Sequence, residues 1–204
     1  MIPIPADAKT ATPPARATEL ACRLRSSASL EDLHRDLSAW LDLFYREFFA
    51  SRGDVLAAHF PAFVDHFERQ GWVEHSDGIL RATEKGRPWF DFLVEQTRSV
   101  VESYYATFSA ALDVGLPVTR KELTKAASEQ LAHTALLGET RLPEAANPVT
   151  FGNAVDVLAS RGVLQQVSAG EGAEGVGGVR YARGEAFDEL RGLRERLAAA
   201  LSAR

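Results

Sequence analysis

The chain has very little cysteine: Cys22 is the only one, so no disulfide can form within its 204 residues. A small fold stapled by disulfides is therefore excluded, and a reducing cytosolic environment fits this composition. Cys22 lies at helical spacing from apolar neighbours. This placement favours a small core residue over a nucleophile, since a nucleophilic thiol needs a base beside it.

Long hydrophobic runs are also missing. The longest uncharged stretch runs from Ala145 to Val155, far short of the roughly 20 residues that a membrane span requires. Residues 1–17 hold four prolines and no apolar segment of the signal-peptide type, which predicts a loose, extended lead-in. We therefore expect a cytoplasmic protein, with peripheral contact to the inner face of the cell membrane as an open option.

The charge is balanced rather than one-sided. The formal net charge is −5, which gives no general attraction to nucleic acid or to anionic lipid. Hydrophobic residues make up 46% of the chain, and this excludes a wholly disordered protein. A globular fold of one generous domain or two small ones follows from the length.

The usual catalytic and ligand-binding signatures are absent. There is no HExxH, CxxC or GxSxG motif, and the glycines of Ser168–Gly178 lack the spacing of a phosphate-binding loop. The spacing of acid pairs such as Glu68 with Glu74 does not indicate a catalytic pair, so we expect these residues to lie on the solvated surface. We predict no catalytic, cofactor-binding or metal-ligating residue and no cofactor. The five histidines, expected to be solvated or at the edge of the core, are His34, His59, His66, His75 and His133.

Helical periodicity and turn residues define the first half. Ser29 followed by Asp32 is a capping-box pattern ahead of an apolar stripe. Pro61 is expected to begin a helix, because its missing N–H would be unpaired there anyway. The predicted elements are helices at 18–25 and from Leu30 to Gly53, a short helical turn, a helix from Pro61 to Gly71, a hairpin at 72–82 and a helix at 87–112.

The second half begins after Gly115-Leu116-Pro117 and repeats the pattern. Thr119 and Glu122 form another capping box. Gly71 and Gly162 each end a helix before a short apolar strand, and they are 91 residues apart. The predicted elements are helices at 119–137 and 149–161, a hairpin at 163–182 and a last helix at 185–202.

The two halves therefore predict one architecture, used twice. Each is a helical core with a small hairpin attached, which is typical of a winged helix. The expected fold class is mainly α: a helical bundle with two small β-hairpins and two winged-helix-like halves. The predicted organisation is a lead-in at 1–17, a first half at 18–114, and a second half with the C-terminal helix at 115–204.

Residues 115–164 resemble the C-terminal region of bacterial glycerol-3-phosphate acyltransferases. The matching features are Thr119-Arg120-x-Glu122-Leu123, Leu131-Ala132-His133, Pro143-Glu144, Val149-Thr150-Phe151, Asn153-Ala154, and Leu158 with Gly162 and Val163. The first half resembles that region in layout only.

This resemblance implies a non-catalytic part of an enzyme of phospholipid biosynthesis. In that family a His five residues before an Asp performs catalysis, in an N-terminal domain with no counterpart here. No His of this chain has an Asp at that spacing. The residues found five positions on are Ala39, Val64, Gly71, Leu80 and Gly138. We therefore expect no acyl transfer by the chain alone.

The resemblance also implies a partner, which is an acyltransferase catalytic domain in the same or another chain, or a second copy. Apolar faces that such a partner would cover are expected to be exposed, with the membrane as another possible surface. The candidate faces are that of Leu41, Phe44, Tyr45 and Phe48, and that of Leu190, Leu193 and Leu197.

Two other interpretations remain open. A winged-helix transcriptional regulator fits the element order, although the 149–161 helix offers only Arg161 to a nucleic-acid groove. A general protein-interaction module would instead use a partly exposed aromatic stripe. The residues of that stripe are Phe44, Phe48, Phe49, Tyr104 and Tyr105.

Overall fold

A computed structural model describes residues 28–48, 54–138, 140, 143–168 and 179–202. The chain divides into two compact units, Met1–Thr97 and Arg98–Arg204, and the division falls inside one long helix. The sequence-based limits of 18–114 and 115–204 set the division at the end of that same helix, and they remain a prediction.

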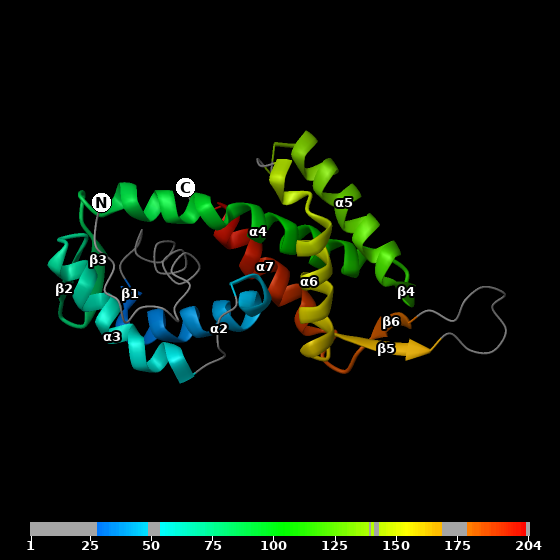
Figure 1. Ribbon diagram of the computed structural model, residues 1–204, viewed down its shortest axis with the longest axis horizontal. Coiled ribbons are helices and arrows are strands. Elements are labelled where there is room, and N and C mark those ends of the chain that lie inside the picture. Colours follow the sequence, from blue (N-terminus) through cyan, green and yellow to red (C-terminus); the bar gives the residue numbers. More distant parts are fainter. Residues whose placement is uncertain (1–27, 49–53, 139, 141–142, 169–178, 203–204) are drawn as a thin grey trace. The chain divides into compact units, whose positions relative to one another are not determined.

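The described part of unit 1 consists of a small sheet, two helices and the first part of the long helix (Figure 1). The strands form an antiparallel sheet in the order β1-β3-β2, so the first strand pairs with the last. The elements are β1 (Ala28–Ser29), α2 (Leu30–Phe48), α3 (Asp54–Arg69), β2 (Val73–Ser76), β3 (Ile79–Ala82) and α4 (Arg87–Asp113).

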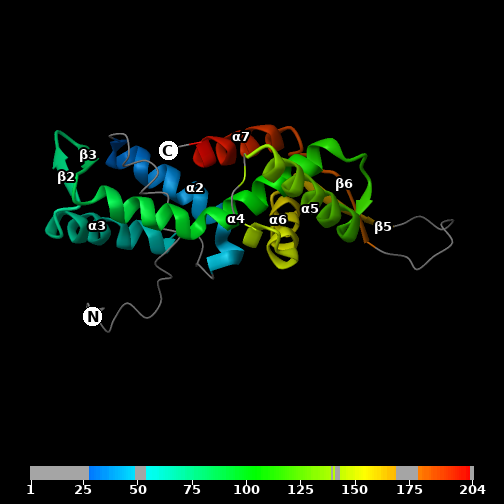
Figure 2. The same ribbon diagram turned by 90° about the horizontal axis from the view of Figure 1, so that it is seen from above.

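The core of unit 1 is apolar. It forms because α2, α3 and the start of α4 each carry apolar residues at steps of three and four, which places them on one face. Figure 2 shows α2, α3 and the start of α4, each of which contributes side chains to this core. The core residues are Leu33, Leu37, Leu41, Phe60, Val64, Phe67, Val73, Leu80, Phe90 and Val94.

Unit 2 repeats the order of elements. Its strands also form an antiparallel sheet in which the first pairs with the last, in the order β4-β6-β5. After the remainder of α4, the elements are β4 (Val118–Thr119), α5 (Arg120–Leu136), the short 3-10 helix η1 (Pro143–Ala145), α6 (Pro148–Ser160), β5 (Leu164–Ser168), β6 (Val179–Arg183) and α7 (Glu189–Ser202).

These elements confirm the mainly helical fold class and both predicted hairpins. Both capping boxes begin a helix where expected. The Asp32 N–H donates to Ser29 Oγ at 3.1 Å, and the Glu122 N–H donates to Thr119 Oγ1 at 3.2 Å. In unit 2 the Glu122 carboxylate also accepts the Thr119 N–H at 2.7 Å, so that box is reciprocal.

The predicted helix start at Pro61 is wrong. Pro61 lies inside α3, which begins at Asp54. Its ring removes only one backbone donor, and the rest of the helix packs its apolar face into the core of unit 1, which outweighs the local cost. The predicted helix at 18–25 and Cys22 lie outside the described residues.

The ends of α3 and α6 are built alike. Gly71 and Gly162 both have a left-handed backbone, with φ of 68° and 72°, which glycine adopts without steric penalty. In each case the next N–H donates to a carbonyl five residues back, at 2.9 Å from Trp72 to Phe67 and 3.0 Å from Val163 to Leu158. This is the Schellman arrangement, repeated with an offset of 91 residues.

Candidate interaction surfaces

All five histidines lie in the described part of the chain. In the described part of the chain, His75 is the histidine that meets a carboxylate, with Nδ1 3.6 Å from Glu68 Oε1 in unit 1. His59 and His66 lie on α3 and are exposed, and His34 packs edge-on against Phe60. No cluster of three His, Cys, Asp or Glu side chains that could hold a metal occurs among the described residues.

His59 and Asp65 are the nearest approach to the acyltransferase spacing, and helix geometry separates them. Both lie on α3, which runs unbroken through Pro61. Six residues along an α-helix turn the side chains by about 240°, so these two project from different sides. A histidine oriented by this aspartate is therefore not formed in α3.

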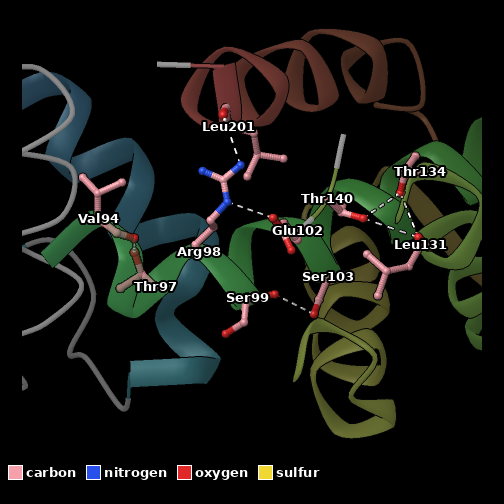
Figure 3. Close-up of polar contacts among 10 residues, drawn as sticks. All are labelled: Val94, Thr97, Arg98, Ser99, Glu102, Ser103, Leu131, Thr134, Thr140 and Leu201. Atoms are coloured by element: carbon pink, nitrogen blue, oxygen red, sulfur yellow. Dashed lines mark hydrogen bonds and ion pairs between the residues drawn. The ribbon is translucent and has the colours of Figure 1, made fainter. Parts of the chain in front are cut away.

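A buried polar cluster lies along α4 in unit 2 (Figure 3). Arg98 Nε donates to Glu102 Oε1 at 2.9 Å, one turn further along α4. A terminal guanidinium nitrogen of Arg98 donates to the Leu201 carbonyl oxygen at 3.4 Å, which ties the end of α7 to α4. Glu102 is 0% exposed and Arg98 only 7%, so these charges hold helices together inside the unit.

A second ion pair joins α5 to α6. The Arg120 guanidinium donates to both carboxylate oxygens of Asp156, at 2.6 and 3.1 Å. A Cβ added at Gly152 would stand 2.6 Å from an Arg120 guanidinium nitrogen, so the glycine makes room for this fork-like contact. The pair fixes how the two helices pack.

The α6 helix presents no groove-reading face. From Phe151 to Ala159 none of its side chains is exposed, and its sequence contains no basic residue. A recognition helix must project polar and basic side chains into a nucleic-acid groove. The geometry of α6 therefore does not favour nucleic-acid recognition through this helix.

Two apolar faces were predicted to be exposed for a partner, one on α2 and one on α7. That prediction is wrong for each of their residues that the structure shows to be buried. The exposed fractions of Leu41 and Phe44 are 5% and 4%. Tyr104 is also fully buried, and Tyr45 is half-buried. The α7 stripe is equally covered, with Leu190, Leu193 and Leu197 at 0%, 3% and 0% exposed. The side chains of Phe48 and Phe49 lie outside the described ones.

Other apolar side chains are exposed instead. Leu136 and Leu137, at the end of α5, are 87% and 61% exposed, and Val149, at the start of α6, is 69% exposed. In unit 1 the exposed pair is Trp89 and Phe92 on α4, at 47% and 54%. The exposure of Trp89 and Phe92 could have been predicted from the helical periodicity of the sequence, because neither residue lies on the apolar stripe that α4 buries.

None of the helices in the described ranges combines the length and hydropathy needed to cross a bilayer.

Together these features define a mainly helical protein of two similarly ordered units, with an internal polar cluster and a few exposed apolar side chains. The family model for the glycerol-3-phosphate acyltransferase C-terminal region matches residues 15–167, and the chain belongs to that family. No curated protein matches it.

Proposed function

We propose that this chain is the non-catalytic C-terminal part of a bacterial glycerol-3-phosphate acyltransferase system of phospholipid biosynthesis. It packs on or regulates a catalytic acyltransferase domain, carried by the same chain or by another. The observation that carries this proposal is the family match over residues 15–167 in a sequence where no His precedes an Asp at the catalytic spacing.

The exposed apolar side chains of unit 2 supply the first surface to test. Leu136 and Leu137 become buried only if another surface covers them, since neither is among the buried residues of α5. Burying such side chains stabilises a complex by about 1.5–3 kcal/mol each. The proposed occupant is the catalytic domain.

Co-elution with a matching N-terminal acyltransferase domain tests the proposal. We expect a complex with this chain and a weaker one with Leu136→Ser/Leu137→Ser. Lys125→Ala is the matched control, because Lys125 is an exposed residue of the same helix. No complex with the parent chain would contradict the proposal.

An activity assay tests the expected lack of catalysis. The isolated chain should transfer no acyl group from acyl-CoA or acyl carrier protein to glycerol 3-phosphate. Turnover that is lost when a histidine such as His59 is replaced would overturn this expectation.

The proposed site of action is the cytoplasm, at the inner face of the membrane. Flotation of the chain with anionic phospholipid vesicles tests the membrane contact.

A second candidate is a winged-helix-like interaction module or transcriptional regulator. The shared strand order in the two units, with the first strand paired to the last, supports a winged-helix arrangement. The buried and uncharged α6 favours a protein partner over nucleic acid. A gel shift with a salt titration separates the two, because binding through phosphates weakens steeply as salt rises.

A further inference from the structure

Strand β5 forms an open sheet edge in unit 2. The sheet has the order β4-β6-β5, so β5 lies at one side of it (Figure 1). Every residue of β5 pairs with β6, from Leu164 with Arg183 to Ser168 with Val179. No backbone hydrogen bond from elsewhere in the described chain reaches β5. Because an edge strand directs alternate N–H and C=O groups away from its sheet, β5 offers a row of backbone donors and acceptors to a further strand.

The side chains of β5 do not protect this edge. Sheet edges are commonly protected from pairing by charged residues, by proline or by being very short. The edge strands β1 and β4 are only two residues long, and β2 carries the exposed Glu74 and His75. In contrast, β5 has five residues without a charge or a proline, and Gln165, Gln166 and Ser168 are exposed. Of the edge strands in the two described sheets, β5 is therefore the one best suited to pairing.

The sequence of β5 fits pairing with a second copy of itself. When two identical strands pair antiparallel about a two-fold axis, one residue faces its own counterpart. Full overlap of the two strands places Gln166 at that axis, and Gln165 of each copy opposite Val167 of the other. Although each copy carries a net charge of −5, no like charges face each other in this register, because β5 has none. The chain's own charge therefore does not oppose contact at this edge.

The side chain of Gln166 suits a position at the axis. Its Nε2 donates to the Tyr181 hydroxyl oxygen at 3.5 Å, and Tyr181 is itself buried on the neighbouring strand. The amide has a second N–H and a carbonyl oxygen, and the residue is exposed. Two such amides that face each other across the axis can hydrogen-bond to one another, so the central pair adds side-chain contacts to those of the backbone.

We propose that two copies of the chain associate by antiparallel pairing of their β5 strands, with Gln166 at the two-fold axis. The two three-stranded sheets then form one continuous sheet. Main-chain hydrogen bonds supply the affinity. A contact of one short strand with another is reversible, so the fraction of dimer rises with protein concentration. The proposal concerns a different surface from Leu136 and Leu137, and it is therefore independent of the acyltransferase partnership.

Disulfide trapping in the full chain tests the register. Cys22→Ser removes the native thiol, so that an introduced cysteine is the only one. In the proposed register the two Cα atoms of residue 166 lie about 4.5–5.5 Å apart, within the range of a disulfide, so Gln166→Cys should form a covalent dimer under mild oxidation. Gln165→Cys is the matched control. Its two copies lie diagonally, about 7–8 Å apart, and should give about tenfold less covalent dimer.

Sedimentation velocity at increasing protein concentration tests the association itself. The parent chain should shift from monomer toward dimer, and Gln166→Lys should weaken the dimer about fivefold, because two ammonium groups then face each other at the axis. Ser76→Lys makes the same change of charge on the edge strand of unit 1 and should leave the dimer unchanged.

A parent chain that stays monomeric at millimolar concentration would overturn the proposal. Equal trapping of Gln166→Cys and Gln165→Cys, or a dimer that Gln166→Lys leaves unchanged, would also overturn it, in favour of another surface such as that of Leu136 and Leu137.

Discussion

Unit 1 buries apolar side chains between α2, α3 and the start of α4, whereas unit 2 buries a set of polar side chains as well. Within the described residues of unit 1 the buried polar side chain is Thr97, at the junction with unit 2. In unit 2 the buried polar residues are Arg98, Glu102, Ser103, Thr107, Ser109, Thr134, Thr140 and Thr150. One order of elements therefore supports two kinds of core.

The buried polar residues of unit 2 join neighbouring segments of the chain to one another. The Ser103 hydroxyl donates to the Ala145 carbonyl, which fixes η1 against α4. Thr140 Oγ1 lies 3.3 Å from Thr134 Oγ1 and holds the chain beyond α5 against that helix. Hydrogen bonds are directional, so such contacts select one arrangement where apolar packing alone would accept several.

The helices at equivalent places also differ. The α3 helix exposes a polar side that includes Asp65, His66 and Arg69, whereas α6 is covered along its middle. The reason is in the sequences: α6 carries a single charged residue, Asp156, and Arg120 neutralises it. Charge content thus decides how deeply each copy of the helix is buried.

Breaking the buried ion pair should give the largest effect. Glu102→Ala leaves the Arg98 guanidinium buried without this carboxylate, and we expect unit 2 to lose about 4 kcal/mol of stability. Arg98→Met/Glu102→Leu gives unit 2 an apolar core like that of unit 1 and should recover most of the loss. Urea unfolding followed by circular dichroism measures both. A double variant no more stable than Glu102→Ala would show that the pair acts through more than its charge.

Replacing Gly86 or Gly184 by Ala should destabilise the two units to a similar extent, because the base of each hairpin is equally crowded. A Cβ at Gly86 would stand 2.0 Å from the Trp72 carbonyl oxygen, and one at Gly184 would stand 2.1 Å from that of Gly162. Backbone atoms cannot yield as a flexible side chain can, so each Gly→Ala change should cost about 3 kcal/mol.

Hydrogen exchange assigns each of these losses to a unit. Gly86→Ala should speed exchange in α2 and α3, and Gly184→Ala in α5 and α6. Gly192→Ala is the control, because a Cβ there meets nothing within 4 Å. In the interior of α7 it should add about 0.5–1 kcal/mol of stability. Equal exchange in both units for both variants would mean that they open together.

Local patterns explain what could be predicted from the sequence. Capping boxes, glycine stops and turn residues act within a few positions, so both hairpins and the starts of α2 and α5 were predictable. Long-range packing was not. A leucine stripe shows that one face of α7 is apolar, but only the fold shows that the same unit covers it. Arg98 and Glu102 have the spacing of an ordinary surface pair, which gives no sign of burial.

The helix caps should show a smaller and matched effect in the two units. Ser29→Ala and Thr119→Ala each remove the side-chain acceptor of the N–H three residues on, so each should cost about 1 kcal/mol. Thermal unfolding measures both, with Ser29→Asp and Thr119→Asp as controls that retain an acceptor. If only one of the two variants loses stability, the sheet of the other unit is sufficient to hold the start of its helix without the cap.

The acid response of the Thr119 cap should be the smallest effect, and it belongs to unit 2. Backbone and side-chain hydrogen bonds from Thr119, aided by the Arg180 charge, lower the pKa of Glu122 below its ordinary value of 4.5. A carboxylate whose pKa falls on folding stabilises the folded state above the ordinary pKa, and this contribution disappears as the pH falls through the lowered value. The stability difference between the parent and Glu122→Gln should therefore be constant above pH 4.5 and shrink below it. Urea midpoints at pH values on both sides of 4.5 measure this difference. A difference that does not change with pH would mean that the cap acts through hydrogen bonding that the neutral amide reproduces.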